Sequence, residues 1–508
     1  MAIPRLDHFI NGAEVAPSSG EYMDVHNPAT GEVIAQVACG TAQDVDHAVA
    51  AAQRAFEDPA WRDLMPADRA ALINKFIDVI KANAQELAYL EIINSGATVS
   101  RVGALDILMM VDACMTMADV VKTYPFVSNL PAKVLPELSD VKVVHEPIGV
   151  CGLIPAWNVP MVMYINKILP ALAAGNTVVI KPSELTPNTS TRLTQLLAPL
   201  LPPGVLNLVN GVGNVVGEAI TQHPGIGKIS FTGSTAVGKR IQANAAASLK
   251  RVTLELGGKG AAIVTPDADL DAVAHGVLYG VMLNAGQACE SGTRLLVHES
   301  IYDALLDKLA ALANGLKLGN PLDPNTVIGP MSHAGHGQRV LGYIRSAVEE
   351  GARVVCGGER AEVAGCAGGF FVRPTVLADC HNQMKAVREE IFGPVLAVIK
   401  YKDECEAIAI ANDSDYGLSA GVWTGDVLAA QRIARRLRAG SVWINDWHML
   451  RSDVPFGGFK QSGTGREFGI AGLEAFLETK AISTAFQRDP AKKALTYGIV
   501  HKRTAAAV

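Results

Sequence analysis

Apolar positions recur along this chain with two different spacings, one helical and one typical of strands. After Thr41, apolar side chains occupy one helical face at Val45, Val49, Ala52 and Phe56. A Thr followed three residues later by an acid is a typical helix start. We therefore predict a surface helix directly after Thr41.

Two more helical patterns follow in the first quarter of the chain. One runs through residues 70–90, and a methionine-rich stretch at 108–117 predicts a third helix. We interpret these methionines as core packing, with pocket lining as the alternative, because the flexible thioether fills irregular gaps in both settings.

From residue 148 onward, short β-branched runs alternate with helical patterns. This alternation is typical of βαβ units and a parallel sheet. The runs form two series, at 177–180, 205–209 and 228–231 and then at 261–264, 294–297, 395–400 and 442–445. We therefore predict two doubly wound, Rossmann-like α/β domains.

Composition narrows the class of protein. The 508 residues are 49% hydrophobic and 19% charged, which is typical of a globular enzyme with a large core. A formal charge of −6, without long charge runs, argues against a nucleic-acid partner. The start lacks a secretion signal, and no apolar stretch reaches the ~18 residues of a membrane helix. We expect a cytoplasmic protein without a membrane partner.

Eight cysteines are dispersed along the chain, without Cys-x-x-Cys pairs or zinc-type spacing. We predict free thiols and no metal site, as is usual in the cytosol. Only Cys289 stands out. It follows Gly286, and the separate segment 254–259 offers the carboxylate of Glu255 beside two glycines. A thiol and a base on separate segments suggest covalent catalysis.

The segment Leu-Glu-Leu-Gly-Gly-Lys at 254–259, followed about thirty residues later by Gly-Gln-x-Cys, resembles the aldehyde dehydrogenase superfamily. Further motifs match in the same order across about residues 8–485. They are Pro-Ala-Trp-Asn at 155–158, Lys-Pro-Ser-Glu at 181–184, Phe-Thr-Gly-Ser at 231–234, Glu-Glu-Ile-Phe-Gly-Pro at 389–394 and Pro-Phe-Gly-Gly-Phe-Lys at 455–460.

The resemblance implies a set of catalytic roles. Cys289 would attack an aldehyde carbon, and the Asn158 amide with the Cys289 backbone N–H would stabilise the resulting oxyanion. Glu255 would be the general base that hydrolyses the thioester, and Lys167 matches a further catalytic position. The family usually has Pro-Trp-Asn where this chain has Pro155-Ala156-Trp157-Asn158, which leaves Asn158 in place.

Glu290, directly after the thiol, is unusual at that position. A carboxylate that pointed inward would raise the pKa of the thiol. Because neighbouring residues on a strand point to opposite sides, we expect Glu290 to face away and pair elsewhere.

For the cofactor, the resemblance implies NAD, and NAD is favoured over NADP because Glu184 would repel a 2′-phosphate. The segment 231–238 follows a predicted strand and opens a helix whose N–H groups suit a pyrophosphate. The glycines at 211–217 have one residue too many for the dinucleotide fingerprint. The implied cofactor residues are Pro155, Trp157, Lys181, Ser183, Glu184, Gly213, Gly217, Phe231, Gly233, Ser234, Val237, Leu256, Glu390 and Phe392.

The substrate lining implied by alignment with the family is largely apolar, which suits a medium-sized aliphatic, terpenoid or aromatic aldehyde. It comprises Val159, Val162, Met163, Tyr279, Leu283, Trp447, Leu450 and Phe456. Relatives often carry bulky aromatic residues at four positions that are not aromatic here, and this predicts a wider tunnel; the positions are Val159, Asn166, Leu283 and Leu450. The alternative is a semialdehyde whose carboxylate is bound by Arg451, beside Asp453.

The resemblance also implies an arrangement of domains. It divides the chain into an NAD-binding domain at 1–125 and 148–257, a catalytic domain at 258–457, and a small β oligomerisation element at 126–147 and 475–490. The chain is therefore expected to form a homo-oligomer, either dimer or tetramer. The tail at 491–508 has no assigned role.

Together these features predict NAD-dependent oxidation of an aldehyde to a carboxylic acid through a thioester on Cys289. A CoA-acylating enzyme is the closest alternative, although such enzymes generally lack the base that Glu255 supplies. A non-catalytic NAD-binding or structural protein is the alternative from another class, and retention of both Cys289 and Glu255 argues against it.

Overall fold

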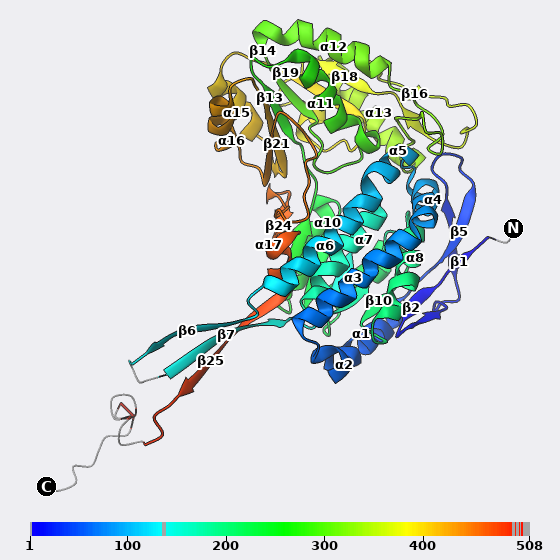
Figure 1. Ribbon diagram of the computed structural model, residues 1–508. Coiled ribbons are helices and arrows are strands. Elements are labelled where there is room, and N and C mark those ends of the chain that lie inside the picture. Colours follow the sequence, from blue (N-terminus) through cyan, green and yellow to red (C-terminus); the bar gives the residue numbers. More distant parts are fainter. Residues whose placement is uncertain (1–2, 135–138, 490–492, 494–496, 498, 501–508) are drawn as a thin grey trace.

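The computed structural model describes residues 3–134, 139–489, 493, 497 and 499–500. Two α/β bodies are stacked on one another, and a long β arm projects from the lower one (Figure 1). The two main sheets have eight and seven strands. Within the described part of the chain, no helix is long and apolar enough to cross a membrane.

The first sheet is parallel at its centre and has antiparallel strands at both edges. In spatial order its strands are β24 (Gly463–Thr464), β12 (Arg251–Glu255), β11 (Lys228–Thr232), β8 (Val150–Ile154), β9 (Thr177–Ile180), β10 (Leu206–Leu208), β2 (His8–Ile10) and β3 (Ala13–Val15). The chain runs outward from β8 in one direction to β10 and in the other to β12. Between β8 and β11 there is therefore a topological switch point, where ligands of such sheets bind.

Both faces of this sheet are covered, because successive side chains of a strand point into cores on opposite faces. Cys151 and Leu153 of β8 belong to one core, whereas Val150 and Ile154 belong to another on the opposite face. The first core is completed by α3 (Pro66–Ala82), α6 (Ile107–Thr123), α7 (Pro160–Ala173) and α8 (Asn188–Leu197), and the second by α1 (Ala42–Glu57) and α10 (Thr235–Ala246). Both faces are buried, as expected of a parallel sheet.

The second sheet is parallel except at one edge. Its order is β15 (Arg353–Cys356), β18 (Thr375–Ala378), β19 (Val395–Tyr401), β14 (Arg294–His298), β13 (Ala261–Val264), β21 (Ser419–Trp423) and β22 (Ser441–Ile444). Its core also includes residues of α11 (Leu270–Met282), α12 (Tyr302–Asn314), α13 (Ala334–Glu349), α15 (Glu404–Asn412) and α16 (Val427–Ala434). The predicted doubly wound fold and the strands of both series are confirmed.

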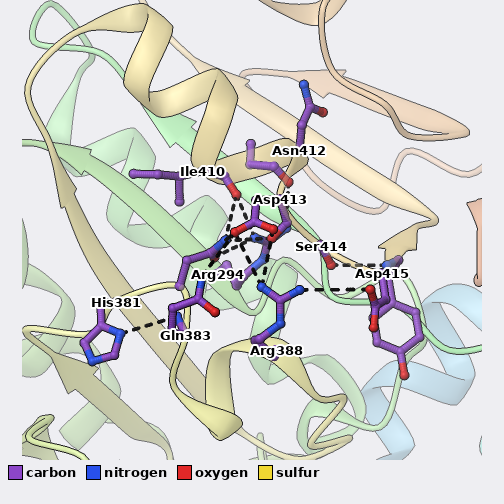
Figure 2. Close-up of polar contacts among 12 residues, drawn as sticks. Arg294, His381, Gln383, Arg388, Ile410, Asn412, Asp413, Ser414 and Asp415 are labelled. Carbon is purple, nitrogen blue, oxygen red and sulfur yellow. Dashed lines mark hydrogen bonds and ion pairs between the residues drawn. The ribbon is translucent and has the colours of Figure 1, made fainter.

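A buried arginine anchors the second sheet beside the predicted active site. Arg294 at the start of β14 donates to the main-chain oxygens of Lys259, Ile410 and Ala411 at 2.9–3.1 Å. Figure 2 shows this side chain next to the Arg388–Asp413 pair. The guanidinium therefore fixes the end of the Glu255 motif against the last turn of α15.

The predicted helix after Thr41 is confirmed as α1, with a capping box between Thr41 and Asp44. The apolar pattern at 70–90 belongs to two helices, α3 and α4 (Ala84–Ser95), which meet at Asn83. The methionine stretch lies in α6, where Met110 is buried in the core.

The projecting arm joins the two segments predicted as an oligomerisation element. Its strands are β25 (Leu477–Ala485), β7 (Ser139–Pro147) and β6 (Val127–Lys133), all antiparallel. Most of β25 is exposed on both faces. Most of the predicted C-terminal tail at 491–508 lies outside the described residues.

Candidate active site

Cys289 lies in a turn that follows α11, after a short stretch in which the backbone reverses. Asn284, Ala285 and Gly286 all have positive φ, at 54°, 53° and 72°. A Cβ at Gly258 would lie 2.2 Å from the main-chain oxygen of Cys289. The glycine motif beside Glu255 is therefore what lets the two segments touch.

Asn158 follows β8, at the switch point of the first sheet. Its side-chain nitrogen donates to the Gln287 carbonyl at 2.9 Å, and Asn284 donates to the Asn158 carbonyl at 2.9 Å. These bonds join the Asn158 loop to the nucleophile turn. One N–H of the Asn158 amide remains for an oxyanion, since the amide has two.

Glu255 ends β12 and is 4% exposed, and its Oε1 is buried without a hydrogen-bond partner among the described residues. Burial and the nearby charge of Glu467 raise the pKa of Glu255 well above its usual range, and the charge of Lys167 partly opposes this shift. Lys167, buried in α7, donates to Glu467 at 2.8 Å and to Ser230 at 3.1 Å. An orphaned carboxyl oxygen beside a cavity suits a group that holds a water molecule.

Two cavities meet at the thiol. Cys289, Asn158, Met163 and Thr232 line both of them. The larger has a volume of about 1070 Å³, and Glu255 and Lys167 also lie on its wall. The smaller, of about 750 Å³, extends over the carboxyl ends of β8 and β11. A nucleophile at such a junction can contact two ligands at once.

The predicted substrate residues mostly lie on the larger cavity. Those on its wall are Val159, Val162, Met163, Tyr279, Leu283, Leu450 and Phe456. Trp447 is not brought to this wall. It is 2% exposed, packs against Gly280, Gly292 and Gly421, and donates from Nε1 to the Glu290 carbonyl at 2.9 Å.

The expectation that Glu290 faces away from the thiol was wrong. Cys289 Sγ donates to Glu290 Oε2 at 3.3 Å, and Glu290 lines the larger cavity. Cys289 and Glu290 lie in a turn rather than a strand, so strand alternation does not separate their side chains. Burial and the charges of Glu290, Glu255 and Glu390 raise the pKa of Cys289 well above its usual range.

Six of the predicted cofactor residues line the smaller cavity. They are Trp157, Gly233, Ser234, Leu256, Glu390 and Phe392. Ser234 caps α10 by accepting from the Val237 N–H at 3.4 Å. The ring of Phe231 lies against Gly233, where a Cβ would approach it to 2.5 Å. This helix start is open to an anion at the edge of the cavity.

A second cluster of predicted cofactor residues lies beyond this cavity. Lys181 Nζ donates to Glu184 Oε2 at 3.0 Å, and the Gly213 N–H donates to Glu184 Oε1 at 3.3 Å. Gly217 packs near the Lys181 stem. The Glu184 carboxylate is thus fixed by two hydrogen bonds. Pro155 and Ser183 flank the two clusters in sequence without lining the cavity.

Comparison with known proteins agrees with this geometry. The family model described as the aldehyde dehydrogenase family matches residues 15–482. The chain belongs to the aldehyde dehydrogenase family. It is 41% identical to DhaS of Bacillus subtilis (strain 168) over 477 residues, which cover 93% of this chain and 94% of that protein.

Solved structures of the family superpose closely on this chain. An aldehyde dehydrogenase of Bacillus cereus in complex with NAD+ has a TM-score of 0.91 at 40% identity, covering 95% of this chain and 97% of that one. Betaine aldehyde dehydrogenase of Staphylococcus aureus, also in complex with NAD+, has a TM-score of 0.93 at 37% identity, covering 95% and 96%.

Some residues of this family member's cavity were missed from the sequence. Two of them contact predicted or neighbouring site residues: His448 contacts Glu290, and Glu467 contacts Lys167. Three more line the cavity from the segment before α6 and from the first turn of α6, namely Arg101, Asp106 and Met109. A single histidine or acid in a loop has no local pattern to distinguish it. The Met-rich stretch at 108–117 was the one available signal, because Met109 lines the cavity while Met110 packs in the core.

Proposed function

We propose that this chain oxidises an aldehyde to a carboxylic acid with NAD, through a thioester on Cys289. The observation that supports this most is the position of Cys289 at the junction of two cavities, with Asn158 beside it and Glu255 on the same wall. One cavity suits the aldehyde. The other has the open start of α10 and the Glu390 carboxylate, which fit a dinucleotide.

In the first half of the reaction, the sulfur of Cys289 attacks the aldehyde carbon and forms a thiohemiacetal. The Asn158 amide and the Cys289 backbone N–H stabilise the oxyanion, and each such donor typically contributes about 10² to 10³ in rate. NAD, when bound, would supply the acceptor for the hydride of this carbon. The sulfur then holds an acyl group.

In the second half, Glu255 takes a proton from water as that water attacks the thioester. The acid leaves and Cys289 returns as a thiol. Lys167 stabilises the charged form of Glu255. Because Glu255 is retained, we favour hydrolysis over transfer of the acyl group to CoA.

For the cofactor, the pair of Lys181 and Glu184 supports NAD over NADP. Glu184 is fixed by Lys181 and by the Gly213 N–H. A 2′-phosphate would lie against this carboxylate, which disfavours it electrostatically.

For the substrate, we propose a medium-sized apolar aldehyde. The wall of the larger cavity includes Val159, Leu283, Leu450 and Phe456, which are all apolar. Arg451, the residue on which the semialdehyde alternative depends, is not on this wall. Its side chain is 70% exposed and pairs with Asp453 at 2.7 Å.

The test is NADH formation by purified protein with NAD and a panel of aldehydes. The panel runs from acetaldehyde through octanal, citral and benzaldehyde to succinate semialdehyde, and Cys289→Ser serves as the control. We expect turnover that prefers the apolar aldehydes and is lost in the variant. Absence of NADH with every aldehyde, while NAD still binds, would contradict the proposal.

A further inference from the structure

Glu290 is held in one orientation by its own main chain. The carbonyl of Glu290 accepts from Ser419 Oγ at 2.8 Å and from Trp447 Nε1 at 2.9 Å. Both donors are buried, on β21 and on the loop after β22. These bonds fix the turn, so the Glu290 side chain is directed at the cavity beside the thiol.

The Glu290 carboxylate bridges two reactive groups. One oxygen accepts from Cys289 Sγ at 3.3 Å, and the other lies 2.9 Å from Nδ1 of His448. The His448 side chain is 3% exposed, and its ring packs edge-on to Tyr279 at 5.3 Å. Thiol, carboxylate and imidazole therefore form a continuous hydrogen-bonded chain on the cavity wall.

We propose that Glu290, positioned by His448, accepts the proton of the Cys289 thiol as the sulfur attacks the aldehyde. The S–H bond breaks as the S–C bond forms, the proton moves to Glu290 Oε2, and the carbonyl electron pair becomes the oxyanion beside Asn158. No oxidant is needed in this step. The inference rests on the proposed function, because the attack on the aldehyde belongs to it.

Geometry and charge both favour Glu290 over Glu255 for this first proton. Glu290 is the carboxylate in hydrogen-bond contact with the thiol. Burial raises the pKa of Glu255 and so favours its protonated form, whereas the hydrogen bond from His448 lowers the pKa of Glu290 despite its burial and so favours the carboxylate. The other groups that act on this pair are Glu390 and Tyr279. Glu290 would serve the first half of the cycle and Glu255 the second.

His448 is a positioning residue in this scheme. Its Nδ1–H fixes one carboxylate oxygen so that the other remains on the sulfur. An Asn side chain has an amide N–H at a similar reach, so His448→Asn keeps the donor while His448→Ala removes it. The conservative variant therefore separates positioning from mere packing.

The experiment has two readouts on the full chain. The first is the rate at which iodoacetamide alkylates Cys289 at neutral pH, without aldehyde or NAD, with Cys289→Ser to identify the labelled thiol. The second is the rate of the first NADH burst. The variants are Glu290→Gln, His448→Ala and His448→Asn. The control variants are Glu349→Gln and His47→Asn, which make the same kinds of substitution at exposed positions.

We expect Glu290→Gln to slow alkylation at least tenfold and the burst by about 10² or more, as for loss of a general base. His448→Ala should slow alkylation and the NADH burst less than Glu290→Gln does. His448→Asn should keep both rates close to those of the unaltered chain. Loss of a negative charge alone would instead lower the pKa of the thiol. Unchanged or faster alkylation in Glu290→Gln would therefore overturn the inference. Slow alkylation in that variant, with no NADH from the unaltered chain, would support it and contradict the proposed function.

Discussion

Two carboxyl groups on one cavity wall have pKa values shifted in opposite directions. Burial and the charge of Glu467 raise the pKa of Glu255. Burial also acts to raise the pKa of Glu290, but the hydrogen bond from His448 outweighs it, and the pKa of Glu290 is lowered. Such separation of neighbouring groups is how enzymes divide acid and base roles. At the residue scale, the site is therefore defined by which charge lies next to each carboxylate.

The charges around Glu255 predict how turnover depends on pH. Because Glu255 must lose its proton to activate water, turnover limited by hydrolysis should rise as pH passes through its raised pKa. Lys167→Met removes a charge that lowers this pKa, so the rising limb should move to higher pH. Glu467→Gln removes a charge that raises it, so the limb should move to lower pH.

The measurement is kcat against pH for the unaltered chain and both variants, where a shift of one pH unit changes activity about tenfold on the limb. Lys239→Met, at an exposed position of α10, is the control. Shifts in the same direction for both variants would show that Glu255 does not set the limb.

That Cys289, Glu255 and Asn158 lie on one cavity could be predicted from the sequence, because each belongs to a motif of several residues. The contact between Cys289 and Glu290 could not. Its direction depends on a turn whose carbonyl is held by Ser419 and Trp447, more than a hundred residues away along the chain. Long-range hydrogen bonds of this kind have no local pattern.

At the scale of elements, the site depends on how closely the nucleophile turn approaches the end of β12. A Cβ at Gly258 would lie 2.2 Å from the Cys289 carbonyl, which is backbone and cannot rotate away. The turn itself is fixed by positive φ angles from Asn284 to Gly286. Contact between two separate segments thus requires a residue without a side chain.

Gly258→Ala should therefore displace the nucleophile turn. We expect a loss of about 1–3 kcal/mol in the free energy of unfolding, typical of overpacking, and a fall in kcat/KM of at least tenfold. Gly103→Ala is the matched control, because a Cβ there meets nothing within 4 Å. Thermal unfolding measures the change in stability of each variant, and the rate of aldehyde oxidation measures the change in kcat/KM. Equal behaviour of the two variants would contradict the close approach.

Elements were predicted well where a local pattern decides them and less well where it does not. The β-branched runs at 177–180 and 261–264 became β9 and β13 because such side chains suit buried parallel strands. The pattern at 70–90 became two helices, since the apolar period continues across Asn83 while the backbone does not.

At the scale of the whole molecule, the β arm projects far from both α/β bodies (Figure 1). It exposes large apolar side chains, among them Val127 at 55%, Leu130 at 47% and Ile482 at 46%. A long exposed strand with apolar side chains is a template for pairing with another chain. We therefore expect the arm to be covered by a second copy.

Ile482→Lys should weaken this pairing and increase the fraction of monomer. Val427→Lys, at an exposed position of α16 in the second body, is the matched control and should leave the assembly unchanged. Light scattering after size-exclusion chromatography gives the mass of each species. An unaltered chain that is monomeric at all concentrations would contradict the prediction.

The central claim is that an acyl group is held on Cys289 between the two half-reactions. The most direct measurement is the intact mass of Glu255→Gln after mixing with octanal and NAD. We predict one acyl adduct per chain, located on Cys289 by peptide mapping, together with about one equivalent of NADH, because hydrolysis is blocked in this variant. NADH formation without any adduct on Cys289, or an adduct on another residue, would contradict the account.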